Sequence, residues 1–184
     1  IPMIIEKEYK GNAKQTTGPF FIDSLAYNHD VKPYEYNTER AVDLLWKAGW
    51  EYDQKEHCWY YLDENGIRKK AACCLKFVRS YDQGKRICEI VSDQLRQIGI
   101  EMTIHGYDFN SKDIENGHFD MYMGGWRLGT SDEDPRQLWH TDSMNGSNYV
   151  KFSNPTADTI IEQLTFETDP DVRKALYHEF HRLI

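Results

Sequence analysis

The stretch AACCLKFVRSYDQGKRICEIVSDQLRQIGIEMTIH, residues 71–105, decides the fold class. Residues 71–78 form an apolar run that is typical of a buried strand. Apolar residues then recur every three or four positions, which indicates one face of a helix; they are Ile87, Ile90, Val91, Leu95 and Ile98. Gly99 ends this helix, and residues 100–105 alternate as a second strand. A strand, a helix and a strand in this order predict two parallel strands joined by a crossover.

Further elements are predicted on both sides of this unit. Helices are expected at 1–10, at 110–117, and after Asn154-Pro155 and Asp169-Pro170. Thr38 can cap a further helix that Gly49 ends, and its apolar residues share one face; they are Ala41, Leu44, Leu45 and Ala48. Strands are expected at 58–62, paired with 71–78 through the turn DENG, and at 120–123. The fold class is therefore α/β, a mostly parallel sheet flanked by helices. We expect a single lobe over 1–184, with an irregular lead-in over 1–37 and a core over 38–184.

Composition excludes several kinds of partner. The formal net charge is −8, which repels nucleic acid and anionic membrane surfaces. No apolar run reaches the roughly 18 residues that a membrane-spanning helix needs. Aromatic residues make up 14% of the chain, which suits either a binding surface or an aromatic core, and both interpretations stay open.

The cysteines predict neither a metal site nor a redox motif. They are Cys58, Cys73, Cys74 and Cys88, and none has the CxxC spacing. Cys73 and Cys74 are adjacent, so they point to opposite faces of a strand, and at most one of them faces Cys58 or Cys88. We expect buried free thiols, although the even count also allows a disulfide.

The stretch FDMYMGGWRLGTSDEDPRQLWH, residues 119–140, carries the candidate site. In open α/β sheets, ligands lie beyond the carboxyl ends of the strands, and Gly124-Gly125 follows such an end. Two glycines permit a close backbone approach or a positive φ, and Trp126 then covers the core or forms the wall of a cleft. Asp134-Pro135 fits a helix cap followed by the first helical residue.

The acids Asp132, Glu133 and Asp134 do not predict a catalytic set. Catalytic carboxylates come from separate elements that face each other across a bond, whereas these three are consecutive. His178 and His181 are three residues apart, not the four of a zinc-protease helix, and no phosphate-binding glycine motif occurs. We therefore predict no catalytic residue, no metal and no cofactor, and keep one acid of the loop as a charged ligand anchor.

Four stretches, taken in order, resemble the C-terminal lobe of family 5 extracytoplasmic solute-binding proteins, the oligopeptide- and dipeptide-binding components of ABC importers. They are TERAVDLLWKAGWEYD at 38–53, the strand–helix–IGIEMTI unit at 73–104, FDMYMGGW with its loop to Trp139-His140, and the tail from YVKFSNPTADTIIEQL to DPDVRKALYHEFHRLI. The resemblance implies a type II periplasmic-binding-protein fold. Because the chain starts and stops within predicted helices, we expect a fragment of a two-lobe protein whose export signal lies upstream.

The resemblance also implies a function. A protein of this family captures oligopeptides between two lobes and delivers them to membrane permease subunits, without catalysis, in the periplasm or at the cell surface. The membrane is touched only indirectly, through the permease or a lipid anchor outside this chain. The ligand-binding residues expected here are Trp126, Arg127, Asp132, Asp134, Trp139, His140 and Asn148.

One departure from the family stays open. In the peptide-binding members, an aspartate a few residues after the Gly-Trp pair holds the peptide's free amine, but Gly129 stands at that position here. Either Asp132 or Asp134 binds the amine in its place, or this protein does not recognise a free amine.

Two rival functions stay open. One is a receptor for a metal chelate of the nickel or haem type, or for another small solute. The other is a hydrolase that uses the acidic loop.

Overall fold

The computed structural model describes residues 1–108, 112, 114–127 and 134–184. It divides into two compact units, each described by itself below. Unit 1 comprises Ile1–Ala13, Glu35–Ser111 and Phe119–Gly124, and unit 2 comprises Lys14–Tyr34, Lys112–His118 and Gly125–Ile184. Among the described residues, no helix is both long and apolar enough to cross a membrane.

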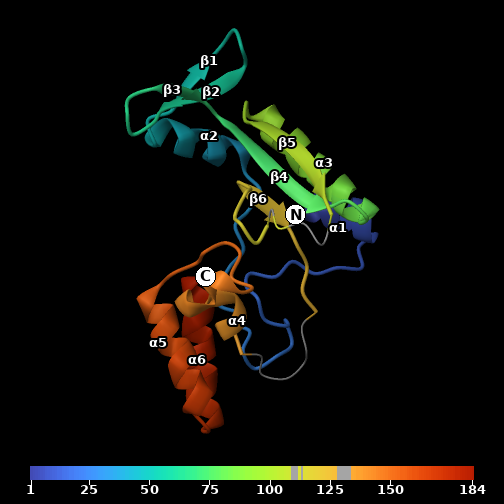
Figure 1. The fold of residues 1–184 in the computed structure, drawn as a ribbon. Coiled ribbons are helices and arrows are strands. Elements are labelled where there is room, and N and C mark those ends of the chain that lie inside the picture. Colours follow the sequence, from blue (N-terminus) through green and yellow to red (C-terminus); the bar gives the residue numbers. More distant parts are fainter. Residues whose placement is uncertain (109–111, 113, 128–133) are drawn as a thin grey trace. The chain divides into compact units, whose positions relative to one another are not determined.

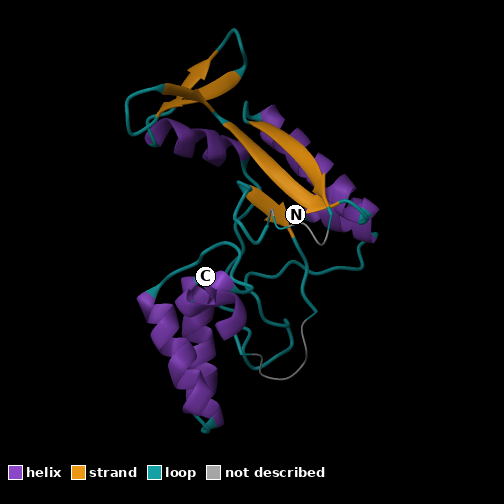
Figure 2. Ribbon diagram, in the orientation of Figure 1, coloured by secondary structure: helices purple, strands orange, loops and turns teal. Residues whose placement is uncertain are grey.

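Unit 1 contains the predicted parallel sheet. Its strands are β4 (Ala72–Val78), β5 (Glu101–Tyr107) and β6 (Met121–Met123), in the order β5-β4-β6, and both pairings are parallel (Figures 1 and 2). Helix α3 (Asp82–Gln97) connects β4 to β5, which confirms the predicted strand–helix–strand unit. One face of the sheet packs on α3 through a buried apolar cluster of Leu75, Phe77, Cys88 and Met102. The α/β fold class is thereby confirmed.

A second sheet in unit 1 corrects the predicted hairpin. Strands β1 (Glu51–Asp53), β2 (Cys58–Leu62) and β3 (Arg68–Lys70) pair antiparallel in that order. The turn DENG therefore joins β2 to the short β3, and not to 71–78 as predicted. Ala71 separates the two sheets: its N–H donates to the Trp59 carbonyl at 2.7 Å, and its carbonyl accepts from the Glu101 N–H at 3.1 Å. The apolar run after β3 belongs to the other sheet.

Two helices precede these strands, α1 (Pro2–Tyr9) and α2 (Thr38–Lys47). Asn37 caps α2, because its side chain accepts from the Arg40 N–H at 2.8 Å, so the predicted cap at Thr38 was one residue late. The helix ends before Gly49, as predicted, and the φ angle of Gly49 is +80°. Of the four apolar residues predicted to share one face, Ala41 and Leu45 are half-buried, whereas Leu44 and Ala48 are exposed, and α2 contains no buried residue.

Unit 2 is built from helices. They are α4 (Arg136–Trp139), the 3₁₀ helix η1 (Thr141–Asn145), α5 (Pro155–Phe166) and α6 (Pro170–Leu183). The side-chain Oδ1 of Asn154 accepts from the Thr156 N–H at 2.9 Å, and the side-chain Oδ1 of Asp169 accepts from the Asp171 N–H at 2.9 Å. Both predicted Asx-Pro starts are thus confirmed, with a polar cap before proline at the first helical turn.

The segment before α2 packs on α5 and α6 in the core of unit 2. This core consists of Phe20, Ala26, Tyr27, Ala157, Ile160, Ile161, Leu164, Tyr177 and Phe180. Residues 14–34 therefore contribute to a core although they contain no regular helix or strand. The boundary predicted at residue 37 does not coincide with the units, and the single lobe over 1–184 stays a prediction.

His181 of α6 holds this segment in place. Its Nδ1 accepts from the Asn28 N–H at 3.0 Å, so the proton of the neutral ring lies on Nε2, which is 3.0 Å from Thr17 Oγ1. A Cβ at Gly18 would lie 2.3 Å from Nε2, so only glycine permits this approach. Burial lowers the pKa of the His181 imidazole, which favours the neutral ring that accepts this bond.

Two smaller predictions have mixed outcomes. The helix predicted over 110–117 falls partly on residues outside the described ones, and residues 112 and 114–117 form turns. All four cysteines are free, as predicted. Cys58 and Cys88 are buried, but Cys73 and Cys74 are only half-buried, because β4 exposes part of both faces at its start.

Candidate ligand-binding site

The carboxyl ends of β4 and β5 are joined by Arg79. Its N–H donates to the Tyr107 carbonyl at 2.8 Å, and its Nη2 donates to the Gly106 carbonyl at 2.8 Å. Its Nε also lies 3.3 Å from Asp108 Oδ1. These contacts hold the two strand ends together at the edge of the sheet where α/β proteins bind ligands.

The two glycines after β6 differ in how much space surrounds them. A Cβ at Gly124 would lie 2.8 Å from the ring of Tyr122, so a side chain at this position would have to displace that ring. A Cβ at Gly125 would meet nothing within 4 Å. Neither glycine has a positive φ, so the close approach, and not the left-handed conformation, explains Gly124. The boundary between the two units falls between these glycines.

The residues after the glycines are exposed. The Trp126 side chain is 53% exposed, and Arg127 is exposed beside it in the sequence. Asp134 is also exposed, and its Oδ1 accepts from the Arg136 N–H at 2.9 Å. The cap predicted at Asp134 was one residue early, because Pro135 is the N-cap of α4 and the helix begins at Arg136. Asp132 and Gly129 lie outside the described residues. Contact between a ligand and these side chains stays a prediction.

Trp139, His140 and Asn148 lie together inside unit 2. The indole of Trp139 packs edge-on against Phe152, with ring centroids 5.4 Å apart. His140 is 3% exposed and Asn148 is 1% exposed. The Asn148 amide donates to the carbonyls of His140 and Phe152 at 3.2 and 2.8 Å, and accepts from the Phe152 N–H at 2.9 Å. These side chains stabilise the loop after α4, and their role as cleft walls stays a prediction.

His140 has a defined tautomer. Its Nδ1 accepts from the Asp142 N–H at 3.1 Å, so Nε2 carries the proton of the neutral ring. Nε2 is buried without a hydrogen-bond partner among the described residues, and Glu162 Oε1 is 3.6 Å away. The His140 side chain therefore faces a carboxylate of α5 across a short gap.

Asp158 of α5 is a positioning residue that the sequence did not reveal. Its two oxygens accept from the Thr141 N–H at 2.9 Å and from Thr141 Oγ1 at 2.6 Å, which ties η1 to α5. Burial raises the pKa of this carboxyl, but the bonds from Thr141 and the nearby His140 and Arg136 lower it more. The net pKa of Asp158 lies below its ordinary value. No local motif marks such a pairing across 17 residues.

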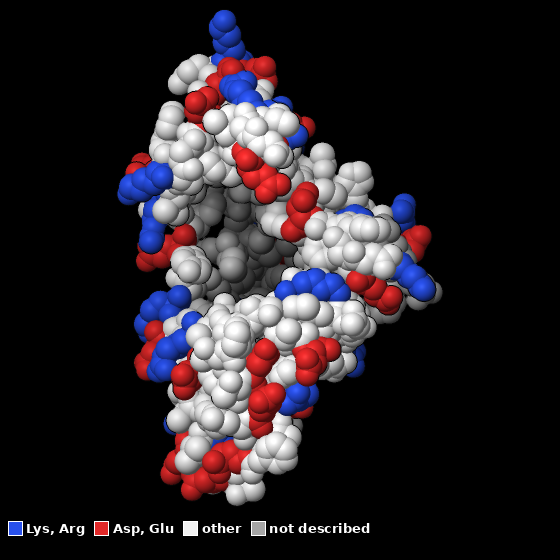
Figure 3. All heavy atoms as spheres, turned by 60° about the vertical axis from the view of Figure 1, so that its left-hand side comes forward, with Lys and Arg blue, Asp and Glu red and all other residues white. Residues whose placement is uncertain are grey.

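In Figure 3, acidic and basic side chains are interspersed over the visible face, without a broad basic patch. Within residues 1–108, 112, 114–127 and 134–184, no group of three or more His, Cys, Asp or Glu side chains is placed to hold a metal.

Comparison with known proteins then decides the family. Residues 3–149 match the family described as bacterial extracellular solute-binding proteins, family 5. The chain belongs to this family. Among similar family 5 proteins is the oligopeptide-binding protein AppA of Bacillus subtilis, which is 28% identical over 169 residues, covering 87% of this chain and 30% of AppA.

Solved structures of family 5 proteins share the fold. The structure of AppA in complex with a nonapeptide superposes with a TM-score of 0.85 at 25% identity, over 99% of this chain and 36% of AppA. An oligopeptide-binding protein of Thermus thermophilus, complexed with a pentapeptide, gives a TM-score of 0.87 at 19% identity, over 99% of this chain and 33% of that protein.

Another relative by sequence is the heme-binding protein A of Haemophilus influenzae. It is 23% identical over 180 residues, covering 96% of this chain and 30% of that protein. The chain thus spans about a third of the length of these relatives.

Proposed function

We propose that this chain is part of the substrate-binding component of an ABC importer. The whole protein captures extracytoplasmic oligopeptides in a cleft between two lobes and delivers them to the membrane permease. The observation that carries this proposal is the likeness to AppA, which was solved with a nonapeptide and matches 99% of this chain at a TM-score of 0.85.

In this proposal the site beyond β6 forms one wall of the cleft. Peptides are held mainly through main-chain hydrogen bonds, and bridging waters fit different side chains into the same pockets. The exposed ring of Trp126 covers the apolar parts of the peptide, and Asp132 or Asp134 offers a negative charge to its amine. Affinity comes from closure of both lobes, so this chain alone binds peptides weakly.

Calorimetric titration of peptide libraries into the full-length protein tests the proposal. Trp126→Ala is expected to weaken peptide binding by at least about tenfold, because a desolvated aromatic contact is a typical hot spot. Phe166→Ala, which removes another exposed ring of unit 2, serves as the matched control and should leave affinity unchanged. If Trp126→Ala binds peptides as tightly as the parent protein, Trp126 is not in the site.

The proposed protein binds without catalysis, and it is exported to the periplasm or the cell surface, where a lipid anchor outside this chain attaches it. Incubation of the full-length protein with the peptides that it binds should leave every peptide intact. Cleavage products that appear only with the protein would instead indicate a hydrolase. If radiolabelled palmitate is not incorporated into the expressed full-length protein, the protein carries no lipid anchor and this part of the proposal is wrong.

The second candidate is a receptor for a metal chelate, favoured by the likeness to heme-binding protein A. Protein purified without an affinity tag distinguishes the two functions. Haemin or a nickel chelate that binds more tightly than any peptide would support this candidate, whereas a metal-free preparation that binds peptides counts against it.

A further inference from the structure

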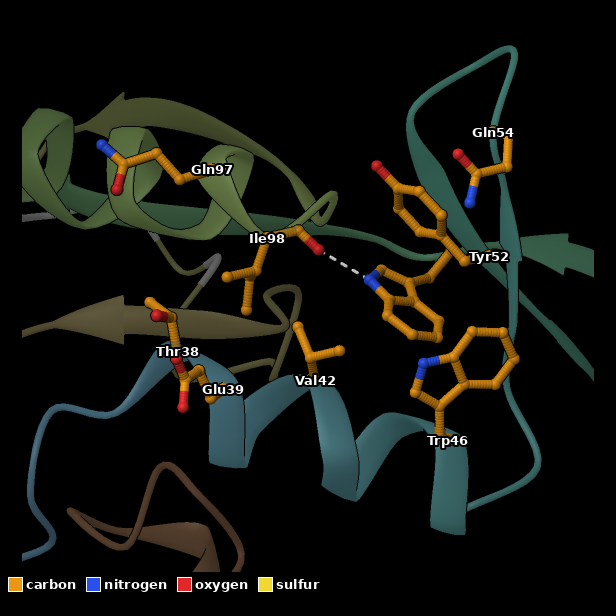
Figure 4. A pocket seen from close by; sticks show the side chains of 9 residues that line it. Thr38, Glu39, Val42, Trp46, Tyr52, Gln54, Gln97 and Ile98 are labelled. Atoms are coloured by element: carbon orange, nitrogen blue, oxygen red, sulfur yellow. Dashed lines mark hydrogen bonds between the residues drawn. The ribbon is translucent and has the colours of Figure 1, made fainter.

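A groove in unit 1 lies near the amino ends of the strands of the parallel sheet. It is a cavity of about 680 Å³ next to Ile98, just before β5 begins, whereas the candidate peptide site follows the carboxyl ends of the strands. This volume is in the range of small-molecule pockets. The groove is lined by Thr38, Glu39, Val42, Trp46, Tyr52, Gln54, Trp59, Gln97 and Ile98 (Figure 4).

Aromatic rings line one part of this groove. Trp59 is 2% exposed, and its Nε1 donates to the Ile98 carbonyl at 2.6 Å, so the ring is fixed as a floor. The Trp46 ring meets it edge-on at a centroid distance of 5.0 Å, and the Tyr52 ring lies 5.1 Å away from it. Trp46 stays 54% exposed although it touches this cluster. An exposed tryptophan in a concave, aromatic site marks a binding surface.

Helix α2 forms one side of the groove. Thr38, Val42 and Trp46 are spaced by four residues and project from one face of α2 into the groove (Figure 4). Thr38 and Val42 lie on the side of Ile98, and Trp46 lies on the side of Tyr52. No residue of α2 is buried, so this helix does not fill the space in front of its own face. The groove is therefore open to a ligand.

The charge in the groove selects the class of ligand. Among the described residues that line it, Glu39 alone carries a charge, and the others are apolar, aromatic, hydroxyl or amide side chains. The carboxyl end of α3 also reaches the groove, and a helix carries a partial negative charge at that end, although the Ile98 carbonyl there already accepts from Trp59 Nε1. The N-terminus of α2, which would favour an anion, already uses the Arg40 N–H for the Asn37 cap. Aromatic faces attract cations through their negative quadrupole.

We propose that this groove binds an organic cation, an ammonium group on an apolar body, at a site separate from the peptide cleft. The apolar body packs on Trp46 and Tyr52, and the ammonium group lies toward the Glu39 carboxylate and the end of α3. This site goes beyond the proposed importer function and does not depend on it.

Two probes that share a phenyl body test the charge preference. Phenethylammonium and 3-phenylpropionate are titrated separately into the full-length protein by calorimetry. The cation is expected to bind at least about tenfold more tightly than the anion. Equal affinities, or no binding of the cation, would overturn the proposal.

Variants then place the cation in the groove. Trp46→Ala and Glu39→Gln should each weaken binding of phenethylammonium by about three- to tenfold. Leu44→Ala is the matched control for the first, because Leu44 is exposed on the same helix but does not line the groove. Asp43→Asn is the control for the second, since Asp43 pairs with Lys47 at 2.6 Å outside the groove.

A final pair of variants separates this site from the peptide cleft. Trp126→Ala should leave the affinity for phenethylammonium unchanged, and Trp46→Ala should leave the affinity for peptides unchanged. If Trp126→Ala abolishes binding of phenethylammonium and Trp46→Ala does not, the cation binds in the peptide cleft, which would refute a separate site.

Discussion

Replacement of His181 by phenylalanine tests how the segment before α2 is held in unit 2. The variant keeps an aromatic ring in the buried position but removes both ring nitrogens. The Asn28 N–H, which donates to Nδ1 at 3.0 Å, then has no acceptor there, and the 3.0 Å contact with Thr17 is lost. A buried donor left without a partner costs about 1–3 kcal/mol, and the second bond contributes about 1 kcal/mol. We expect a local loss of about 2–4 kcal/mol in total.

Amide hydrogen exchange in the full-length protein measures this loss where it occurs. A local destabilisation of about 2–4 kcal/mol raises exchange in a peptide that covers residues 17–28 by roughly 30- to 1000-fold. Peptides from the parallel sheet of unit 1 should exchange as before. If exchange across residues 17–28 is unchanged in His181→Phe, the imidazole does not hold this segment.

The same bond predicts a dependence on pH. Burial lowers the pKa of His181 from its ordinary value of 6.5, and the nearby His178 and His29 lower it further. Because the folded pKa is lowered, the contribution of His181 is complete above pH 6.5 and is lost as pH falls through the lowered pKa. The parent protein should therefore lose protection of residues 17–28 on acidification, and His181→Phe should lack this step. His29→Gln, a change of an exposed histidine, should retain it.

Other positions give further expectations, each measured by thermal melting or hydrogen exchange of the full-length protein. Phe180→Ala removes a fully buried ring and should cost about 3–5 kcal/mol, whereas the exposed Phe166→Ala should change stability by less than about 0.5 kcal/mol. Asn154→Ala should cost about 1 kcal/mol and increase exchange in the first turn of α5, and Asn154→Asp, which can still cap, should not. Gly99→Ala should destabilise unit 1, because φ is +83° and the new Cβ would lie 2.7 Å from Tyr52; a melting temperature equal to that of the parent would contradict this.

The elements that the sequence predicted well are those with local signals. Asn154 and Asp169 each precede a proline and an apolar stripe, and both begin helices as expected. In contrast, β3 is three exposed basic residues without any alternation, so nothing in the sequence separates it from the preceding turn. The hairpin was assigned to the wrong strand because Ala71 alone divides β3 from the apolar run of β4.

The candidate site was harder to predict because the sequence does not show which neighbouring groups its side chains contact. Two adjacent glycines after a strand are visible in the sequence, but only the position of the Tyr122 ring shows why Gly124 is needed. Asn148 is predicted as a polar wall residue, and the structure adds that its amide bonds to backbone groups at His140 and Phe152. A polar residue in a loop does not reveal whether it faces solvent or completes the loop's own hydrogen bonds.

The position of Ala71 between two sheets has a consequence for the groove. Its peptide groups bond to Trp59 on one side and to Glu101 on the other, and the Trp59 N–H donates to the Gly99 carbonyl at 3.1 Å. Main-chain hydrogen bonds therefore connect the strand that carries Trp59 to the chain around Ile98, and neither can move without breaking them. A ligand in this groove would meet a floor at Trp59 and Ile98 that is already in position, so little ordering entropy would be lost on that side of the groove. Its affinity should change little when the two lobes of the full-length protein open or close.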